Sequence, residues 1–178
     1  DEAEKRKATQ VLLDRLAQGQ DRRVPAALLA VAPPPVAEAA LRSAMAKDEP
    51  ASVAAAVALG ELTGGGGKDA LLRLLSKGID PVLAAIGLQR YAGPDVDAVL
   101  LPMLENANGE MAQHLTEALW SGHRLQRYTT TGPMWGLRLL NVRLWSPYPS
   151  IRRPAVAELR KVLDAVTRGQ DPRTLGYS

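Results

Sequence analysis

Apolar residues recur along the first two thirds of the chain at spacings of three and four, which is the spacing of one face of an α-helix. Apolar segments begin near Leu12, Leu41, Leu71 and Leu100, which stand 29, 30 and 29 residues apart. Each segment is followed by a polar break and then by a second segment rich in Ala and Leu. The pattern predicts four antiparallel helix pairs over residues 1–121.

The residues in the breaks agree with this division. Pro25, Pro50 and Pro81 stand at or just before the second helix of a pair, where a first-turn proline removes no hydrogen bond. Residues suited to capping precede these second helices: Asp21, Asp48, Asp80 and Asn108. Lys47 and Lys77 fall in equivalent breaks, 30 residues apart.

One helix pair is too thin to bury its own apolar face, so pairs are expected to stack on their neighbours. The apolar content comes mainly from Ala, Leu and Val, without any Phe, which favours helices over a β-sandwich. The sequence therefore predicts a single all-α domain over residues 1–178. We expect an α-solenoid of stacked antiparallel helix pairs, with four pairs in 1–121 and an atypical unit in 122–178.

The repeated segments resemble the short HEAT-like repeats, sometimes called the PBS-lyase type, over about Ala8 to Trp120. The segment 150–163 resembles the second helix of such a unit and is similar to 21–29. The resemblance implies a HEAT/armadillo-like fold. Family units often carry an Asp-x-x-Val-Arg pattern, and this chain departs from it with Ala54 and Leu83 where Arg is expected.

The pattern changes at His123. Residues 123–132 are expected to form a loop, and Thr131 is expected to cap a helix that starts at Pro133. A strand over residues 137–145 is the alternative to that helix. Prolines make 146–150 a break, and the tail after Arg168 is expected to be irregular.

Charge and aromatic residues are distributed unevenly along the chain. Residues 1–121 contain 12 Lys/Arg and 16 Asp/Glu, whereas residues 122–178 contain 10 Lys/Arg and three Asp/Glu. Six of the seven Trp and Tyr residues stand at or after Trp120. Arginine with Trp and Tyr is typical of recognition surfaces, because guanidinium groups and aromatic rings both make large, directional contacts.

We therefore expect a non-catalytic protein-interaction or scaffold module whose contact surface lies in this basic region. The favoured partner is a protein, with an acidic surface as one option; nucleic acid is the weaker alternative, because the chain has no Lys-rich run. The structural alternative is that these arginines form a solvated face or dock on the acidic repeats, with Trp135 and Trp145 capping the core. The candidate binding residues are Arg124, Arg127, Tyr128, Arg138, Arg143, Trp145, Tyr148, Arg152 and Arg153.

Catalysis has little support in the sequence. The two histidines, His114 and His123, match no metal-ligand spacing, and no Cys is present. The segment 64–69 resembles a phosphate-binding loop but has Asp69 where Ser or Thr is needed, so a turn is expected instead. We expect no catalytic residue, metal or cofactor; an enzyme with an unrecognised site around His123 and Tyr128 is the lesser alternative.

Location in the cell stays open. The chain contains no apolar run near the roughly 20 residues that span a bilayer, so a soluble domain is expected. A start at Asp1 in place of Met is compatible with a cytoplasmic protein or with an exported protein that has lost its signal.

Overall fold

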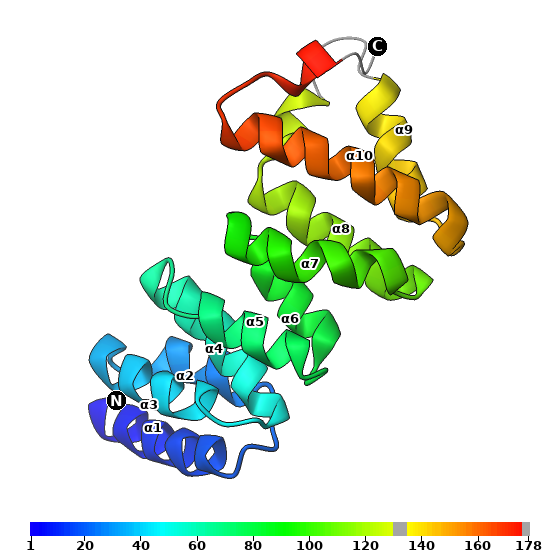
Figure 1. Ribbon diagram of the computed structural model, residues 1–178. Coiled ribbons are helices and arrows are strands. Elements are labelled where there is room, and N and C mark those ends of the chain that lie inside the picture. Colours follow the sequence, from blue (N-terminus) through cyan, green and yellow to red (C-terminus); the bar gives the residue numbers. More distant parts are fainter. Residues whose placement is uncertain (130–134, 176–178) are drawn as a thin grey trace. The chain divides into compact units, whose positions relative to one another are not determined.

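The computed structural model describes residues 1–129 and 135–175, and this part of the chain is all helical (Figure 1). It contains ten α-helices and two 3-10 turns, and no strand among those residues. The elements are α1 Glu2–Ala17, α2 Val24–Val31, α3 Pro34–Met45, α4 Pro50–Thr63, α5 Lys68–Ser76, α6 Pro81–Leu88, α7 Pro94–Asn106, α8 Gly109–Gly122, η1 Leu125–Tyr128, α9 Trp135–Leu144, α10 Pro149–Thr167 and η2 Pro172–Leu175. The predicted all-α class is confirmed.

The helix boundaries test several finer expectations. Residues 137–144 are helical in α9 and Trp145 directly follows it, so the strand alternative over 137–145 is wrong. Part of the loop expected at 123–132 is the 3-10 turn η1. The cap at Thr131 and the helix start at Pro133 lie outside the described residues.

Two of the expected helix caps have different outcomes. Asn108 caps α8 as expected, because its side chain accepts a hydrogen bond of 2.8 Å from the Met111 amide. The expectation for α4 was wrong by one residue: Glu49, and not Asp48, is the cap, and it forms a capping box with Ser52. The reason is that Pro50 begins the helix, so the residue directly before it occupies the capping position.

The contacts divide the chain into two compact units, Asp1–Gly87 and Leu88–Ser178. In the N-terminal unit, α4 packs against α2, α3 and α5. This helix is apolar on almost every side, and its small side chains let the neighbouring helices approach closely. The buried residues of α4 are Ala51, Ser52, Val53, Ala54, Ala55, Ala56, Ala58, Leu59 and Gly60.

In the C-terminal unit, α10 packs against α7 and α9, and α7 packs against α8. Figure 1 shows α9 and α10 side by side. Fully buried aliphatic residues from these four helices form the core: Leu100, Leu104, Leu115, Leu119, Leu137, Leu140, Leu144, Val156, Leu159 and Val162. Among the described residues, no helix combines the length and the apolar character needed to cross a membrane.

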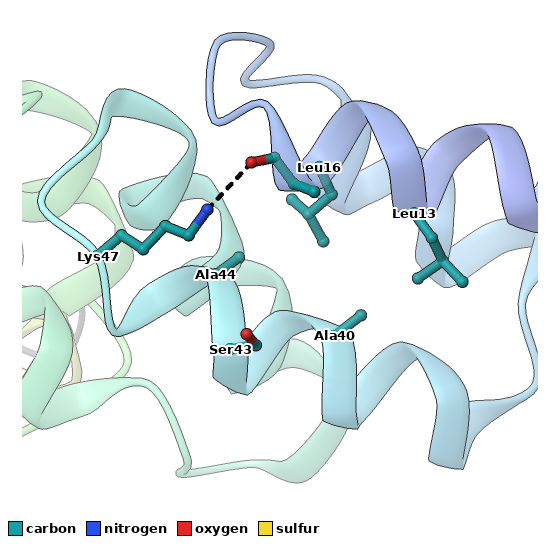
Figure 2. Close-up of a pocket in the computed structure, with 7 residues that line it drawn as sticks. Leu13, Leu16, Ala40, Ser43, Ala44 and Lys47 are labelled. Atoms are coloured by element: carbon teal, nitrogen blue, oxygen red, sulfur yellow. Dashed lines mark hydrogen bonds between the residues drawn. The ribbon is translucent and has the colours of Figure 1, made fainter.

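In the N-terminal unit, the last residues of two helices each accept a hydrogen bond, through their backbone carbonyl, from a cationic side chain that comes later in the sequence. The Lys47 ammonium donates a hydrogen bond of 3.0 Å to the Ala17 carbonyl, at the last residue of α1 (Figure 2). The Arg73 guanidinium of α5 donates one of 2.7 Å to the Met45 carbonyl, at the last residue of α3. The last carbonyls of a helix have no partner within it and carry partial negative charge, so both contacts are favourable.

Asp48 strengthens the second of these contacts. Its carboxylate accepts hydrogen bonds from Arg73 and from Lys77. The bond from the Lys77 ammonium, together with the charge of Arg73, holds the pKa of Asp48 below its usual value of 3.8. The break between α3 and α4 is therefore joined to α5 by three polar contacts.

The glycine run at 64–67 is a tight turn between α4 and α5. Gly64 ends α4 in the left-handed conformation, with φ at 76°. Gly67 lies so close to α4 that a Cβ atom there would stand 2.0 Å from the Ala56 carbonyl oxygen. The run is thus explained by packing and by the turn, as the sequence predicted.

This close approach predicts that Gly67→Ala destabilises the protein by about 1–3 kcal/mol, because the backbone of α4 or α5 must shift to admit the methyl group. The measurement is urea unfolding followed by circular dichroism. Gly65→Ala is the matched control, since a Cβ atom at Gly65 meets nothing within 4 Å. Equal stability of the two variants would contradict the packing explanation.

Candidate interaction surface

Arg152 is the most deeply buried polar group of the basic region. Its side chain lies at the start of α10 and is 0% exposed. The guanidinium donates a hydrogen bond of 2.7 Å to the Leu104 carbonyl and further bonds to the carbonyls of Ala107 and Ser146. All three donating nitrogens therefore end on backbone oxygens.

These partners explain how a charge is tolerated in the core. Leu104 and Ala107 lie at the C-terminal end of α7, where free carbonyls carry partial negative charge. Burial lowers the pKa of Arg152, and the nearby charge of Arg153 lowers it further. Arginine remains charged in proteins despite such shifts, so three charge-assisted hydrogen bonds offset its loss of hydration.

Arg152 also fixes the break between α9 and α10. Ser146 belongs to this break, and its carbonyl is held to the same guanidinium as the end of α7. The exposed rings of Trp145 and Tyr148 lie directly on either side, at 41% and 65% exposure. Arg152 was predicted as a binding residue, but its side chain is enclosed, and its hydrogen bonds support the segment that carries the two rings.

The other candidate arginines are closer to solvent. Arg153 is exposed and donates a hydrogen bond of 3.1 Å to the Asn106 side chain. Arg143 is half-buried and forms an ion pair with Glu158 of α10. Arg138 is exposed, and its guanidinium donates a hydrogen bond of 3.2 Å to the Thr129 carbonyl.

The candidates that precede α9 gather at η1. Arg124 is exposed and precedes η1 in the left-handed conformation, with φ at 54°. The Arg127 guanidinium stacks on the Tyr128 ring, 4.7 Å from its centre, and donates a hydrogen bond of 2.7 Å to its hydroxyl. The candidate residues thus fall into a group at η1 and a group around α9 and α10.

Helix α9 is apolar on two sides. Leu137, Leu140 and Leu144 are fully buried against the core. On the outward side, Leu139 is 59% exposed and Val142 is 65% exposed. A helix with apolar residues on both sides is normally covered on both, whereas the described residues 1–129 and 135–175 leave the outward side of α9 exposed.

Further exposed apolar residues follow α9 in the sequence. With the two on α9 they make five, which we call the α9 apolar row; they stand three residues apart in sequence: Leu139, Val142, Trp145, Tyr148 and Ile151. Among the described residues, nine large apolar side chains are exposed, and this row supplies five of them within 13 positions. Such clustering is typical of contact surfaces, whereas single exposed apolar residues are ordinary.

The charge around the row has one sign in the sequence. No Asp or Glu occurs between Glu117 and Glu158, while six arginines do. Two of these six are engaged internally: Arg152 by backbone carbonyls and Arg143 by Glu158. The exposed members of the set are Arg124, Arg127, Arg138 and Arg153.

Three members of the row were missed by the sequence reasoning, which singled out only Trp145 and Tyr148. Leu139, Val142 and Ile151 were not among the candidates, because an apolar residue in a helix normally faces inward, whereas these three are exposed. A usable signal was present in the carboxylate-free stretch and in the three-residue spacing of the row.

The two histidines lie away from this row in sequence. His123 is buried and forms a hydrogen bond of 2.8 Å with Asp97, which ties the end of α8 to the first turn of α7. His114 lies 4.0 Å from Glu117, one turn along α8.

A groove of about 340 Å³ between α7 and α10 has Asp97, Arg160 and Asp164 in its lining. The described residues contain no cluster of three or more potential metal ligands.

The burial of Arg152 predicts that Arg152→Met destabilises the protein by about 2–4 kcal/mol, because three carbonyls lose charge-assisted hydrogen bonds. Urea unfolding followed by circular dichroism measures the effect. Arg153→Met is the control at the adjacent exposed position, where a change within about 0.5 kcal/mol is expected. Similar losses at both positions would contradict the role given to Arg152.

Comparison with known proteins adds no relative to this picture: no protein-family model matches the chain, and neither the curated proteins nor the solved structures that were searched gave a match.

Proposed function

We propose that this protein is a non-catalytic interaction module in which HEAT-like helix pairs stack as a solenoid and present a contact surface to another protein. The alternation of first and second helices supports the stacking, as do the cations that join one break to a later helix. The single observation that carries the function is the α9 apolar row, which exposes five large apolar side chains beside arginines.

The size and chemistry of the row favour a protein partner. Protein interfaces have an apolar centre with aromatic residues and arginine, surrounded by polar residues. Trp145 and Tyr148 supply the aromatic part, and Leu139 and Val142 supply aliphatic area. The bonds of Arg152 hold the segment at Ser146 in place before binding, which lowers the ordering cost of association.

Nucleic-acid binding is the second candidate. Exposed rings and arginines suit stacked bases and phosphates. The aliphatic members of the row weigh against it, because Leu139, Val142 and Ile151 offer neither a stacking plane nor a charge. Binding to nucleic acid would also weaken steeply with rising salt, whereas burial of an apolar row would not.

A pull-down with the double variant Leu139→Ser/Val142→Ser tests the proposal. We expect specific partners to be lost from the variant, because two apolar contacts of the row are replaced by hydroxyls. The variant should stay folded by circular dichroism, since both side chains are exposed.

The control is Val11→Ser/Val36→Ser, which removes two exposed valines from α1 and α3. Recovery of the same proteins by wild type and control, with loss only in the α9 variant, supports the surface. Equal recovery by all three proteins would rule out the row as the contact site.

A further inference from the structure

The outward side of α9 carries an oblique row of apolar side chains. Leu139 and Val142 stand one helical turn apart, and Trp145 lies one further turn along. Trp145 keeps the helical path although it follows the last residue of α9, because its amide donates a hydrogen bond of 3.2 Å to the Asn141 carbonyl. The three side chains therefore lie on one side of the helix, at a spacing of about 5 Å per turn.

Such a row has the dimensions that a second helix covers. The opposite side of α9 is already occupied, because Leu137, Leu140 and Leu144 are buried in the core. What remains is a narrow apolar line with polar neighbours and not a broad sheet. An amphipathic helix matches a line of this kind through apolar residues at positions i, i+3 or i+4, and i+7.

The charge of the stretch that carries the row selects among possible helices. The stretch 118–157 contains no carboxylate, so nothing within it repels an acidic partner. Arg153 is exposed, and its guanidinium donates a hydrogen bond to the neutral side chain of Asn106. Its positive charge is therefore not compensated by that contact. A basic helix would meet like charge here, whereas an acidic helix would meet complementary charge.

Symmetric pairing of two copies through this surface is disfavoured for the same reason. A two-fold interface brings each patch against itself, so arginines of one copy would face arginines of the other. Helix α1 of a second copy is a poor occupant as well, because residues 1–17 hold four acidic and four basic side chains. The occupant that fits both the apolar row and the charge is a different, acidic chain.

We infer that the outward side of α9 binds an acidic amphipathic helix of a partner protein, with apolar residues against Leu139, Val142 and Trp145 and carboxylates toward the neighbouring arginines. This assignment rests on the proposed function of the surface as a protein contact site. The inference adds to that function the chemical class of the partner, an acidic amphipathic helix.

An anionic membrane is the competing occupant that shares part of this chemistry. Membrane recognition through charge relies on clusters of four to eight Lys or Arg residues. The stretch 118–157 has six arginines and no lysine, and the side chains of Arg143 and Arg152 are already engaged inside the protein. The four outward arginines are divided between η1, with Arg124 and Arg127, and the α9–α10 group, with Arg138 and Arg153. Neither group reaches four, which favours a peptide that also uses the apolar row.

The test uses synthetic peptides of about 18 residues, which is long enough for an isolated amphipathic helix to form. One peptide carries Leu on one face and Glu elsewhere; a second has the same Leu positions with Lys in place of Glu; a third keeps the Glu composition with the Leu positions scrambled. Each fluorescently labelled peptide is titrated with the full chain and followed by fluorescence anisotropy.

We expect the Glu peptide to bind and the Lys and scrambled peptides to bind at least about tenfold more weakly, a difference of about 1.4 kcal/mol or more. The Leu139→Ser/Val142→Ser variant should weaken the Glu peptide about tenfold or more, and Arg153→Glu should weaken it as well. Val11→Ser/Val36→Ser should leave its affinity unchanged.

Equal binding of the Glu and Lys peptides, or binding that the α9 variant does not weaken, would overturn this inference. So would row-dependent binding of phosphatidylserine vesicles or of a single-stranded oligonucleotide in place of the Glu peptide. The pull-down distinguishes a wrong partner class from a wrong function. If partner recovery depends on the α9 apolar row and the Glu peptide does not bind, the partner class is wrong and the contact surface stands. If the pull-down is independent of the row, the proposed function itself fails.

Discussion

The structure depends on cations that close the carboxyl ends of helices. Lys47 binds the end of α1, Arg73 binds the end of α3, and Arg152 binds the end of α7. In each case the free carbonyls at the end of one helix accept hydrogen bonds from a side chain that comes later in the chain. The end of a helix thereby becomes a contact with another part of the chain. The same physical device holds breaks in both compact units.

At α7 this device also shapes the surface. Because one guanidinium binds both Ala107 and Ser146, the break after α9 cannot move independently of α7. Trp145 and Tyr148 are carried by that break, and their exposure is a consequence of where it is held. The burial of Arg152 and the exposure of the two rings are therefore linked. The function proposed for the rings depends on the hydrogen bonds of Arg152.

The fold class and the helix positions were predictable, because they follow from local spacing: Leu41 and Leu71 lie on buried helix faces, and Asn108 caps α8. The site was predictable only in part. Composition identified the basic region, but nothing in the sequence distinguishes the buried Arg152 from its exposed neighbour Arg153. Their roles differ because Arg152 faces carbonyls 45 and 48 residues away, and no local pattern encodes such a contact. The outward side of α9 was not predicted, because an apolar helix residue such as Val142 is expected to face a core and no local pattern marks it as exposed.

The most direct test of this account is the exchange of the arginine Nε protons with solvent, followed by NMR. The Nε proton of Arg152 is hydrogen-bonded to the Leu104 carbonyl and shielded from water, whereas the Arg153 side chain is exposed. The account predicts exchange at Arg152 that is slower than at Arg153 by orders of magnitude, since it requires local opening of the structure. Equally fast exchange at both positions would show that Arg152 is not the buried support on which the surface depends.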